Sequence, residues 1–128
     1  MEKTSLLKIS SLEVAFGSTS VLQNISLNLY HNEILGVVGE SGSGKSITSL
    51  SILGLLKNAN TSGTIMFHEK NLLEATEKQL RKIRGNKISM IFQEPMTSLN
   101  PYQKVGVQIQ EVLTVHKGMR RKQARTNV

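Results

Sequence analysis

The 128 residues predict an α/β fold, in which strands and helices follow one another along the chain. Residues 25–30 alternate apolar and polar side chains, as a half-buried strand does. Residues 33–39 form an apolar run that ends in glycine, which is typical of a strand covered on both faces. After a Gly-rich loop, apolar residues recur with helical spacing at Ile47, Leu50, Leu53 and Leu56, so that one helix face can pack on a sheet.

The first third of the chain predicts a β-rich region. Residues 6–16 are apolar and β-branched without a helical period, which indicates one or two strands. Residues 17–20 read Gly-Ser-Thr-Ser and predict a turn, and residues 31–32 predict a second turn after the alternating strand. The run at residues 33–39 is then expected at the centre of a parallel sheet.

The middle of the chain continues the alternation of helices and strands. The helix that starts at Lys45 is expected to reach about Leu56, and residues 64–68 predict a short strand. Thr76 and Gln79 have the spacing of a capping box, which predicts a helix that ends near Gly85. Residues 87–92, KISMIF, predict another buried strand.

The last part of the chain predicts a loop, a helix and a basic tail. Residues 93–101 contain two prolines and predict a loop. A helix face follows at Val105, Ile109, Val112 and Leu113. The tail KGMRRKQAR carries five of the positive charges that give the chain its net charge of +7, and a solvated helix face is the simplest interpretation.

Composition excludes several classes of function. With no cysteine, the chain has neither disulfides nor a thiolate metal site, which fits a reducing cytoplasm. The apolar runs are far shorter than the roughly 20 residues of a membrane-spanning helix, and the N-terminus has no signal-peptide pattern. Only two Tyr, three Phe and no Trp are present, so we expect no nucleic-acid partner that stacks bases on aromatic rings.

Residues 39–46, GESGSGKS, fit the phosphate-binding pattern G-x-x-x-x-G-K-[ST]. The glycines let the backbone aim successive N–H groups at a phosphate, and the following helix adds its N-terminal donors. Lys45 supplies a positive charge for the β- and γ-phosphates, and Ser46 offers a hydroxyl oxygen to Mg²⁺. A Ser/Gly-rich linker that happens to contain a lysine is the alternative, but it does not explain the apolar run before the loop or the helix after it. The pattern therefore predicts Mg²⁺-dependent binding of a nucleoside triphosphate.

Three stretches in order identify the chain as similar to the ATP-binding subunits of ABC transporters, in the dipeptide, oligopeptide and nickel importer group. They are LEVAFG, GESGSGKS and MIFQEPMTSLNP. In this family Phe16 matches the aromatic residue that stacks on adenine, and Gln93 matches the glutamine of the Q-loop. Taken alone, Phe16 is typical of a strand core residue and Gln93 of an exposed side chain. Their places around the phosphate-binding pattern give them these roles.

The resemblance implies a P-loop NTPase fold of the ABC type, covering residues 1–128 as a partial nucleotide-binding domain with a β-rich subdomain and an incomplete parallel core sheet. It implies ATP and Mg²⁺ as cofactors, with Ser46 and Gln93 near the metal and Gln93 as the residue close to the chemistry. The residues expected to bind the nucleotide are Phe16, Gly39, Glu40, Ser41, Gly42, Ser43, Gly44, Lys45 and Ser46.

The family also implies partners and a location. The expected partners are two transmembrane permease subunits, a second ATPase subunit and, indirectly, an extracytoplasmic solute-binding protein. The expected place is the cytoplasmic face of the membrane, where ATP hydrolysis in the intact parent drives import of peptides or a related solute. A non-transport ABC ATPase remains an alternative, and so does an inert nucleotide-binding fragment.

Several family features are missing from this sequence. Asn32 and Glu69 stand where the family often has glycine, and Asn71 and Glu94 stand where aspartate is common. No aspartate occurs among the nine acidic residues, and the family's signature motif, Walker B carboxylates and switch histidine are absent. We therefore expect the 128 residues alone to fold poorly and to lack ATPase activity. The three histidines lie far apart in the sequence, so a metal site built from them is not expected.

Overall fold

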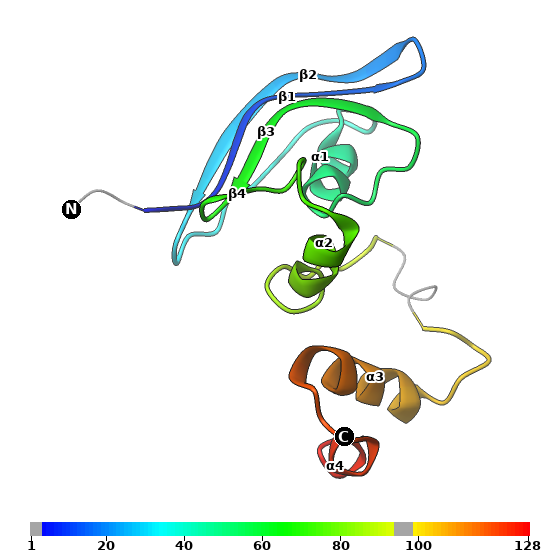
Figure 1. The fold of residues 1–128 in the computed structure, drawn as a ribbon. Helices are drawn as coiled ribbons and strands as arrows, with labels where there is room; N and C mark the ends of the chain where they lie inside the picture. The colour runs from blue at the N-terminus through cyan, green and yellow to red at the C-terminus, as the bar shows by residue number, and fades with distance from the viewer. Residues whose placement is uncertain (1–3, 94–98) are drawn as a thin grey trace. The chain divides into compact units, whose positions relative to one another are not determined.

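The computed structural model describes residues 4–93 and 99–128. The chain divides into two compact units, Met1–Leu80 and Arg81–Val128, and each is described by itself. The first unit contains a curved sheet with a helix against it (Figure 1). The α/β class and the β-rich subdomain predicted from the sequence are confirmed.

The sheet of the first unit is antiparallel throughout. Its strands are β1 (Ser5–Phe16), β2 (Thr19–Tyr30), β3 (Asn60–Phe67) and β4 (Lys70–Asn71). Their order across the sheet is β2-β1-β3-β4, so the long strand β1 has a neighbour on each side. The strand predicted at residues 6–16 is thus a single strand, and the one predicted at residues 25–30 is the second half of β2.

A bulge in the middle of β1 keeps its apolar side chains on one face. Ser11 has φ 47, and the register of β1 shifts there against both neighbouring strands. The extra residue changes the alternation from odd to even positions. Gly63 lies opposite with φ 90, and a Cβ atom on it would fall 2.3 Å from the carbonyl oxygen of Ser11. The side chains of β1 buried in this way are Leu7, Ile9, Leu12 and Val14.

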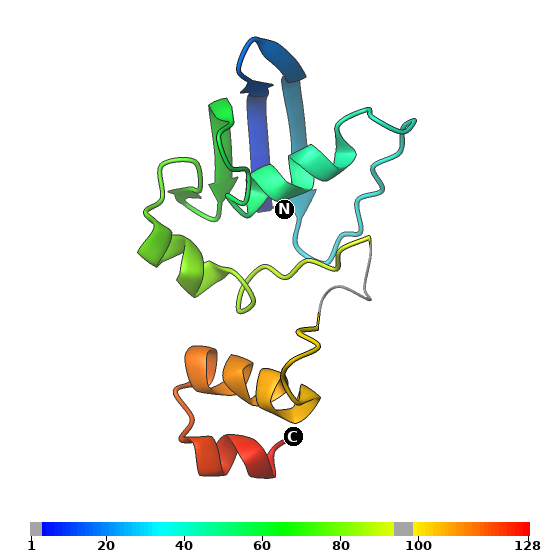
Figure 2. The same cartoon turned by 90° about the vertical axis from the view of Figure 1, so that its right-hand side faces the viewer.

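Helix α1 (Lys45–Ile52) starts where the sequence predicted but ends sooner. Gly54 takes φ 60, and its amide donates to the carbonyl of Ser51 at 3.0 Å. The amide of Leu55 donates to the carbonyl of Leu50, also at 3.0 Å. This pair of bonds is a Schellman ending, which overrides the apolar spacing that had suggested a helix to about Leu56. Figure 2 shows α1 crossing the face of the sheet.

The capping box predicted for α2 (Glu77–Ile83) is confirmed. The amide of Thr76 donates to Oε1 of Gln79 at 2.8 Å, and the amide of Gln79 donates to Oγ1 of Thr76 at 3.4 Å. Gly85 follows with φ 72, the left-handed conformation expected just after a helix.

The second unit contains α3 (Val105–Lys117) and α4 (Arg121–Thr126), which pack against each other. The predicted helix face from Val105 lies in α3, whose apolar side chains remain partly or largely exposed. The basic tail forms α4, and Ala124 of this helix is fully buried. Residues 94–98 of the loop predicted at 93–101 lie outside the described residues.

The prediction that residues 33–39 and 87–92 form two strands of a parallel core sheet is wrong. Residues 33–39 form no strand, and Ile34 and Val38 are 99% and 94% exposed. Residues 87–92 contain only an isolated parallel bridge between Arg84 and Ile88, and Ile91 is 93% exposed. A strand forms only where a neighbouring strand accepts its backbone hydrogen bonds. Among the described residues, neither run has such a neighbouring strand. An apolar composition alone is therefore not enough to make either run a strand.

Candidate functional site

The phosphate-binding pattern lies in the first unit, in the loop that leads into α1. Gly44 is the N-cap of the helix, with φ 93 and ψ 2, so its backbone is left-handed. A side chain at this position would be strained, which is why glycine suits it. The prediction that the Gly-rich loop opens a helix is confirmed.

Close packing against the sheet gives Gly44 a second reason to lack a side chain. A Cβ atom there would fall 2.2 Å from Cδ2 of Leu22 and 3.7 Å from the carbonyl oxygen of Val21. Leu22 is only 2% exposed, so it belongs to the core of the sheet. The end of the loop is therefore fixed to β2, and the start of α1 is fixed with it.

The ammonium group of Lys45 lies within the loop. Its Nζ donates to the carbonyl oxygens of Gly39 at 2.8 Å and Glu40 at 2.7 Å, and to Oγ of Ser43 at 3.2 Å. The amide of Ser43 donates to the carbonyl of Glu40 at 3.2 Å. All three bonds of the ammonium group are exposed to solvent, where water can replace the protein oxygens. The positive charge is thus held near the loop without being buried.

The start of α1 offers free donors to an anion. It has no side-chain cap and no acidic residue in its first turn. The orphan N–H groups and the positive end of the helix dipole therefore lie at the end of α1 that begins with Lys45. Ser46 lies in this first turn and is exposed, as are Ser41 and Gly42 of the loop. These residues fit a phosphate group: several amide donors, one ammonium and no competing carboxylate in the helix turn.

Phe16 lies on the sheet that supports this loop. It is half-buried at the end of β1, directly before Gly17, which has φ 59. Gly44 approaches Leu22, as described above. Leu22 pairs with Val14, and Phe16 follows Val14 by two residues, or about 7 Å along the strand. Phe16 and Leu22, on which the loop rests, therefore belong to the same hairpin, although Phe16 and the loop are far apart in the sequence.

The remaining site candidate, Gln93, lies in the second unit with an exposed side chain. Glu94, which stands where the family often has aspartate, lies outside the described residues. Within the first unit, the end of the loop contacts β2, which pairs with β1, the strand bearing Phe16. Ser46, the expected partner of Gln93 around a metal ion, lies in the first unit.

The departures from family glycines have simple local solutions. Asn32 takes φ 59, a conformation that asparagine tolerates better than most residues. In the turn between β3 and β4 the left-handed residue is His68, with φ 52, and not Glu69. Asn71 accepts hydrogen bonds from the amides of Ile65 and Leu73 through Oδ1, as an aspartate could. Its Nδ2 also donates to Oε1 of Glu74 at 2.8 Å, which an aspartate could not do.

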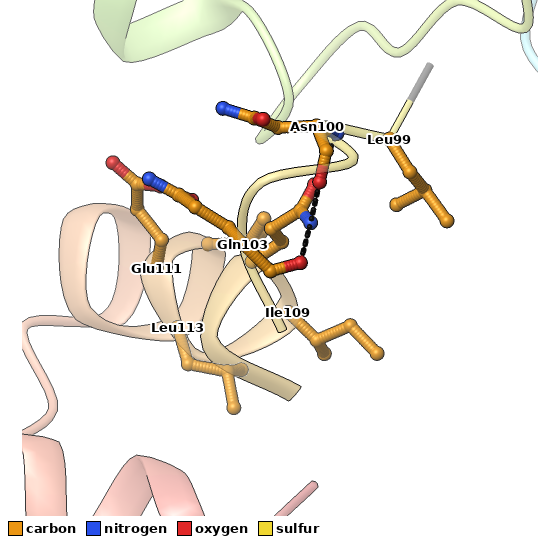
Figure 3. A pocket seen from close by; sticks show the side chains of 8 residues that line it. Leu99, Asn100, Gln103, Ile109, Glu111 and Leu113 are labelled. Carbon is orange, nitrogen blue, oxygen red and sulfur yellow. Dashed lines mark hydrogen bonds between the residues drawn. The ribbon is translucent and has the colours of Figure 1, made fainter. Parts of the chain in front are cut away.

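A pocket of about 670 Å³ in the second unit was not anticipated from the sequence. The side chain of Gln108 in α3 forms hydrogen bonds with the backbone of the loop before this helix. Its Oε1 accepts from the amide of Asn100 at 2.9 Å, and its Nε2 donates to the carbonyls of Asn100 and Gln103, both at 2.9 Å (Figure 3). No sequence signal marks a glutamine for this role, because its partners are backbone groups. The pocket is lined by Leu99, Asn100, Gln103, Gln108, Ile109, Glu111, Val112 and Leu113.

Comparison with known proteins supports the interpretation of the loop. A family model described as "ABC transporter" matches residues 22–128. The chain is 49% identical over 131 residues to the uncharacterized ABC transporter ATP-binding protein YejF of Escherichia coli, covering 97% of this chain and 25% of YejF. It is 44% identical over 124 residues to the oligopeptide transport ATP-binding protein OppD of Salmonella typhimurium, covering 93% of this chain and 37% of OppD.

A solved structure is also similar. The chain matches cbiO1 of Clostridium perfringens, a part of the ABC transporter complex cbiONQ, with a TM-score of 0.69 and 26% identity. The match covers 98% of this chain and 47% of cbiO1. The chain thus spans less than half the length of each of these proteins. Among the described residues, no helix is long and apolar enough to cross a membrane.

Proposed function

This chain belongs to the ABC transporter family, and from that premise we propose that residues 39–46 bind the β- and γ-phosphates of ATP. The observation that carries the proposal is the convergence of three features at one point. They are the left-handed Gly44 packed on Leu22, the uncapped start of α1 and the ammonium group of Lys45 held in the loop. Each favours an anion that approaches the backbone closely.

The other nucleotide contacts follow from the same placement. Phe16 stacks on the adenine, since it ends β1, and the neighbouring strand β2 carries Leu22, on which the loop rests. Ser46 supplies a hydroxyl oxygen to Mg²⁺, which prefers oxygen ligands. Gln93 supplies a second oxygen and lies close to the γ-phosphate in the assembled protein. ATP bound with Mg²⁺ provides the phosphoryl group whose transfer to water releases energy, and the residues named here hold and orient it.

In the longer protein to which these residues correspond, we propose that ATP hydrolysis drives the import of peptides. The resemblance to an oligopeptide transport ATP-binding protein supports this choice of substrate class. The protein would work with two transmembrane permease subunits and a second ATPase subunit, and would receive its solute through an extracytoplasmic binding protein. It would lie on the cytoplasmic face of the membrane, attached through those permease subunits.

Titration calorimetry with Mg²⁺ and a non-hydrolysable ATP analogue tests the nucleotide site. Lys45→Ala should weaken binding by about 1.5–3 kcal/mol, or roughly 10- to 150-fold, as expected when hydrogen bonds to a charged group are lost. Lys57→Ala, which removes an exposed lysine just beyond α1, is the matched control and should bind normally. Stability should barely change, because the partners of Lys45 are exposed. Equal affinity in both variants would contradict the proposal.

The 128 residues themselves fit a second function, that of a nucleotide-binding segment without catalysis. The sequence contains no aspartate, and P-loop enzymes use one to help hold Mg²⁺. We expect the chain to bind the analogue but to release no phosphate from ATP above the rate of Lys45→Ala. A malachite-green assay that detects steady, Lys45-dependent release would contradict this expectation.

A further inference from the structure

The fold brings together two histidines that the sequence separates. His31 follows β2 and His68 follows β3, yet the centroids of their rings lie 5.9 Å apart, with an interplanar angle of 41°. Both β2 and β3 pair with β1, and their last residues lie opposite the start of that strand. The two turns therefore leave the sheet at the same end. The two histidines are thus far apart in the sequence but close together in the fold.

Local structure holds His68 in place. Its amide donates to the carbonyl of Leu6 at 3.1 Å, which ties the turn to β1. Its ring meets the ring of Phe67 edge to face, with centroids 4.6 Å apart. Its φ of 52 lies in the left-handed region, which histidine enters more often than most residues other than glycine. The contacts of this turn thus fix the position of the His68 ring.

The turn that carries His31 is also ordered by its own contacts. The amide of Tyr30 donates to Oε2 of Glu33 at 2.7 Å, closing the turn, and Asn32 supplies the left-handed residue with φ 59. His31 and His68 are both exposed. Solutes therefore reach both rings without any opening of the fold.

We propose that His31 and His68 together bind a borderline divalent transition-metal ion, such as Cu²⁺, Ni²⁺ or Zn²⁺. Two imidazole rings that bind one ion through nitrogens at about 2.0–2.1 Å place their centroids about 4.5 Å apart at a right angle and about 6.4 Å apart when opposite, and the observed 5.9 Å lies within this range. Imidazole suits these ions, and Cu²⁺ binds most tightly among them. Mg²⁺ prefers oxygen ligands, so the site is independent of the metal that accompanies ATP.

The site has two protein ligands, and water fills the remaining positions. Within residues 4–93 and 99–128, no cluster of three or more histidine, aspartate or glutamate side chains is placed to hold a metal. The carboxylate of Glu33 already accepts the hydrogen bond from Tyr30. An open two-histidine site exchanges its ion readily, in contrast to a closed structural site with four ligands.

Cu²⁺ binding to the untagged 128-residue chain, followed by electron paramagnetic resonance, tests the proposal. One equivalent of Cu²⁺ should give a spectrum with coupling to two imidazole nitrogens. His31→Asn and His68→Asn should each remove one of the two couplings and weaken binding by at least about tenfold, since even the loss of an outer partner costs 10- to 100-fold. Asparagine is chosen because it tolerates the left-handed backbone of residue 68.

His116→Asn is the matched control, because His116 lies in α3 of the second unit. It should keep both couplings and the wild-type affinity. Circular dichroism of each variant shows whether the sheet is retained. Equal losses in all three variants would mean that copper binds an unfolded chain through any histidine, and would overturn the proposal. Unchanged affinity in His68→Asn, or coupling to a single nitrogen in the wild type, would overturn it as well.

Discussion

Replacing Gly44 by alanine tests how the phosphate-binding loop is fixed to the sheet. Two separate costs are expected, one from the backbone and one from packing. Gly44 has φ 93, and the added Cβ would fall 2.2 Å from Cδ2 of Leu22. Leu22 is 2% exposed and pairs with Val14 in the sheet, so its side chain has little room to move away.

The magnitude follows from these two terms. Holding alanine in the left-handed region costs about 1–2 kcal/mol. Forcing a methyl group into packed core atoms costs about 1–3 kcal/mol more. In the longer protein to which these residues correspond, Gly44→Ala should therefore lower the free energy of unfolding by about 2–5 kcal/mol, a large share of the roughly 5–15 kcal/mol that a domain has. Gly42→Ala is the matched control, since Gly42 has φ 82 but no atom within 4 Å of the added Cβ.

Urea unfolding followed by circular dichroism measures both variants. Gly42→Ala should lose only the backbone term, about 1–2 kcal/mol. The difference between the variants isolates the packing term, because the effect of alanine on the unfolded chain is the same in both. Leu22→Ala in the Gly44→Ala background should cost less than in the wild type, because it also removes the clash with the added methyl group. Equal destabilisation by Gly44→Ala and Gly42→Ala would refute the packing explanation.

Two further predictions concern the adenine contact and the unpaired apolar runs. Phe16→Ala should weaken binding of the ATP analogue by about 1–3 kcal/mol, as the loss of a stacked base typically does, and unchanged affinity in calorimetry would return Phe16 to a purely structural role. In hydrogen exchange followed by mass spectrometry, residues 34–38 should exchange within seconds, while peptides from the centres of β1 and β3 should be protected, because only the strands have ladder hydrogen bonds. Protection of residues 34–38 comparable to that of β1 would show that this run is paired after all.

Local signals predicted those parts of the fold whose stabilising groups lie close together in the sequence. The capping box at Thr76 and Gln79 and the glycine that follows α2 involve partners a few residues apart, and both are present. The Gly-rich loop that opens α1 is likewise made from residues that are close together in the sequence. The end of α1 was missed because the left-handed Gly54 outweighs the apolar spacing around it. Propensity and periodicity are weaker than a specific ending of this kind.

Signals that depend on distant partners were less reliable. The apolar runs at residues 33–39 and 87–92 resemble buried strands in composition, but a strand also requires a neighbour, and composition does not provide one. The bulge at Ser11 could not be predicted from the sequence either, because it depends on the close approach of Gly63 from another strand. The role of Gln108 depends on backbone carbonyls and left no pattern to find.

The sequence by itself predicts the chemistry proposed for the candidate site. Eight consecutive residues specify a loop, a charge and a hydroxyl group, because a phosphate-binding loop is made from one short stretch of backbone. Only the tertiary structure decided what surrounds that stretch. It packed Gly44 on Leu22, set Phe16 on the same hairpin and brought His31 to His68. These pairs depend on the antiparallel register of β1 with its two neighbours, and that register is a property of the folded sheet, which no single segment encodes.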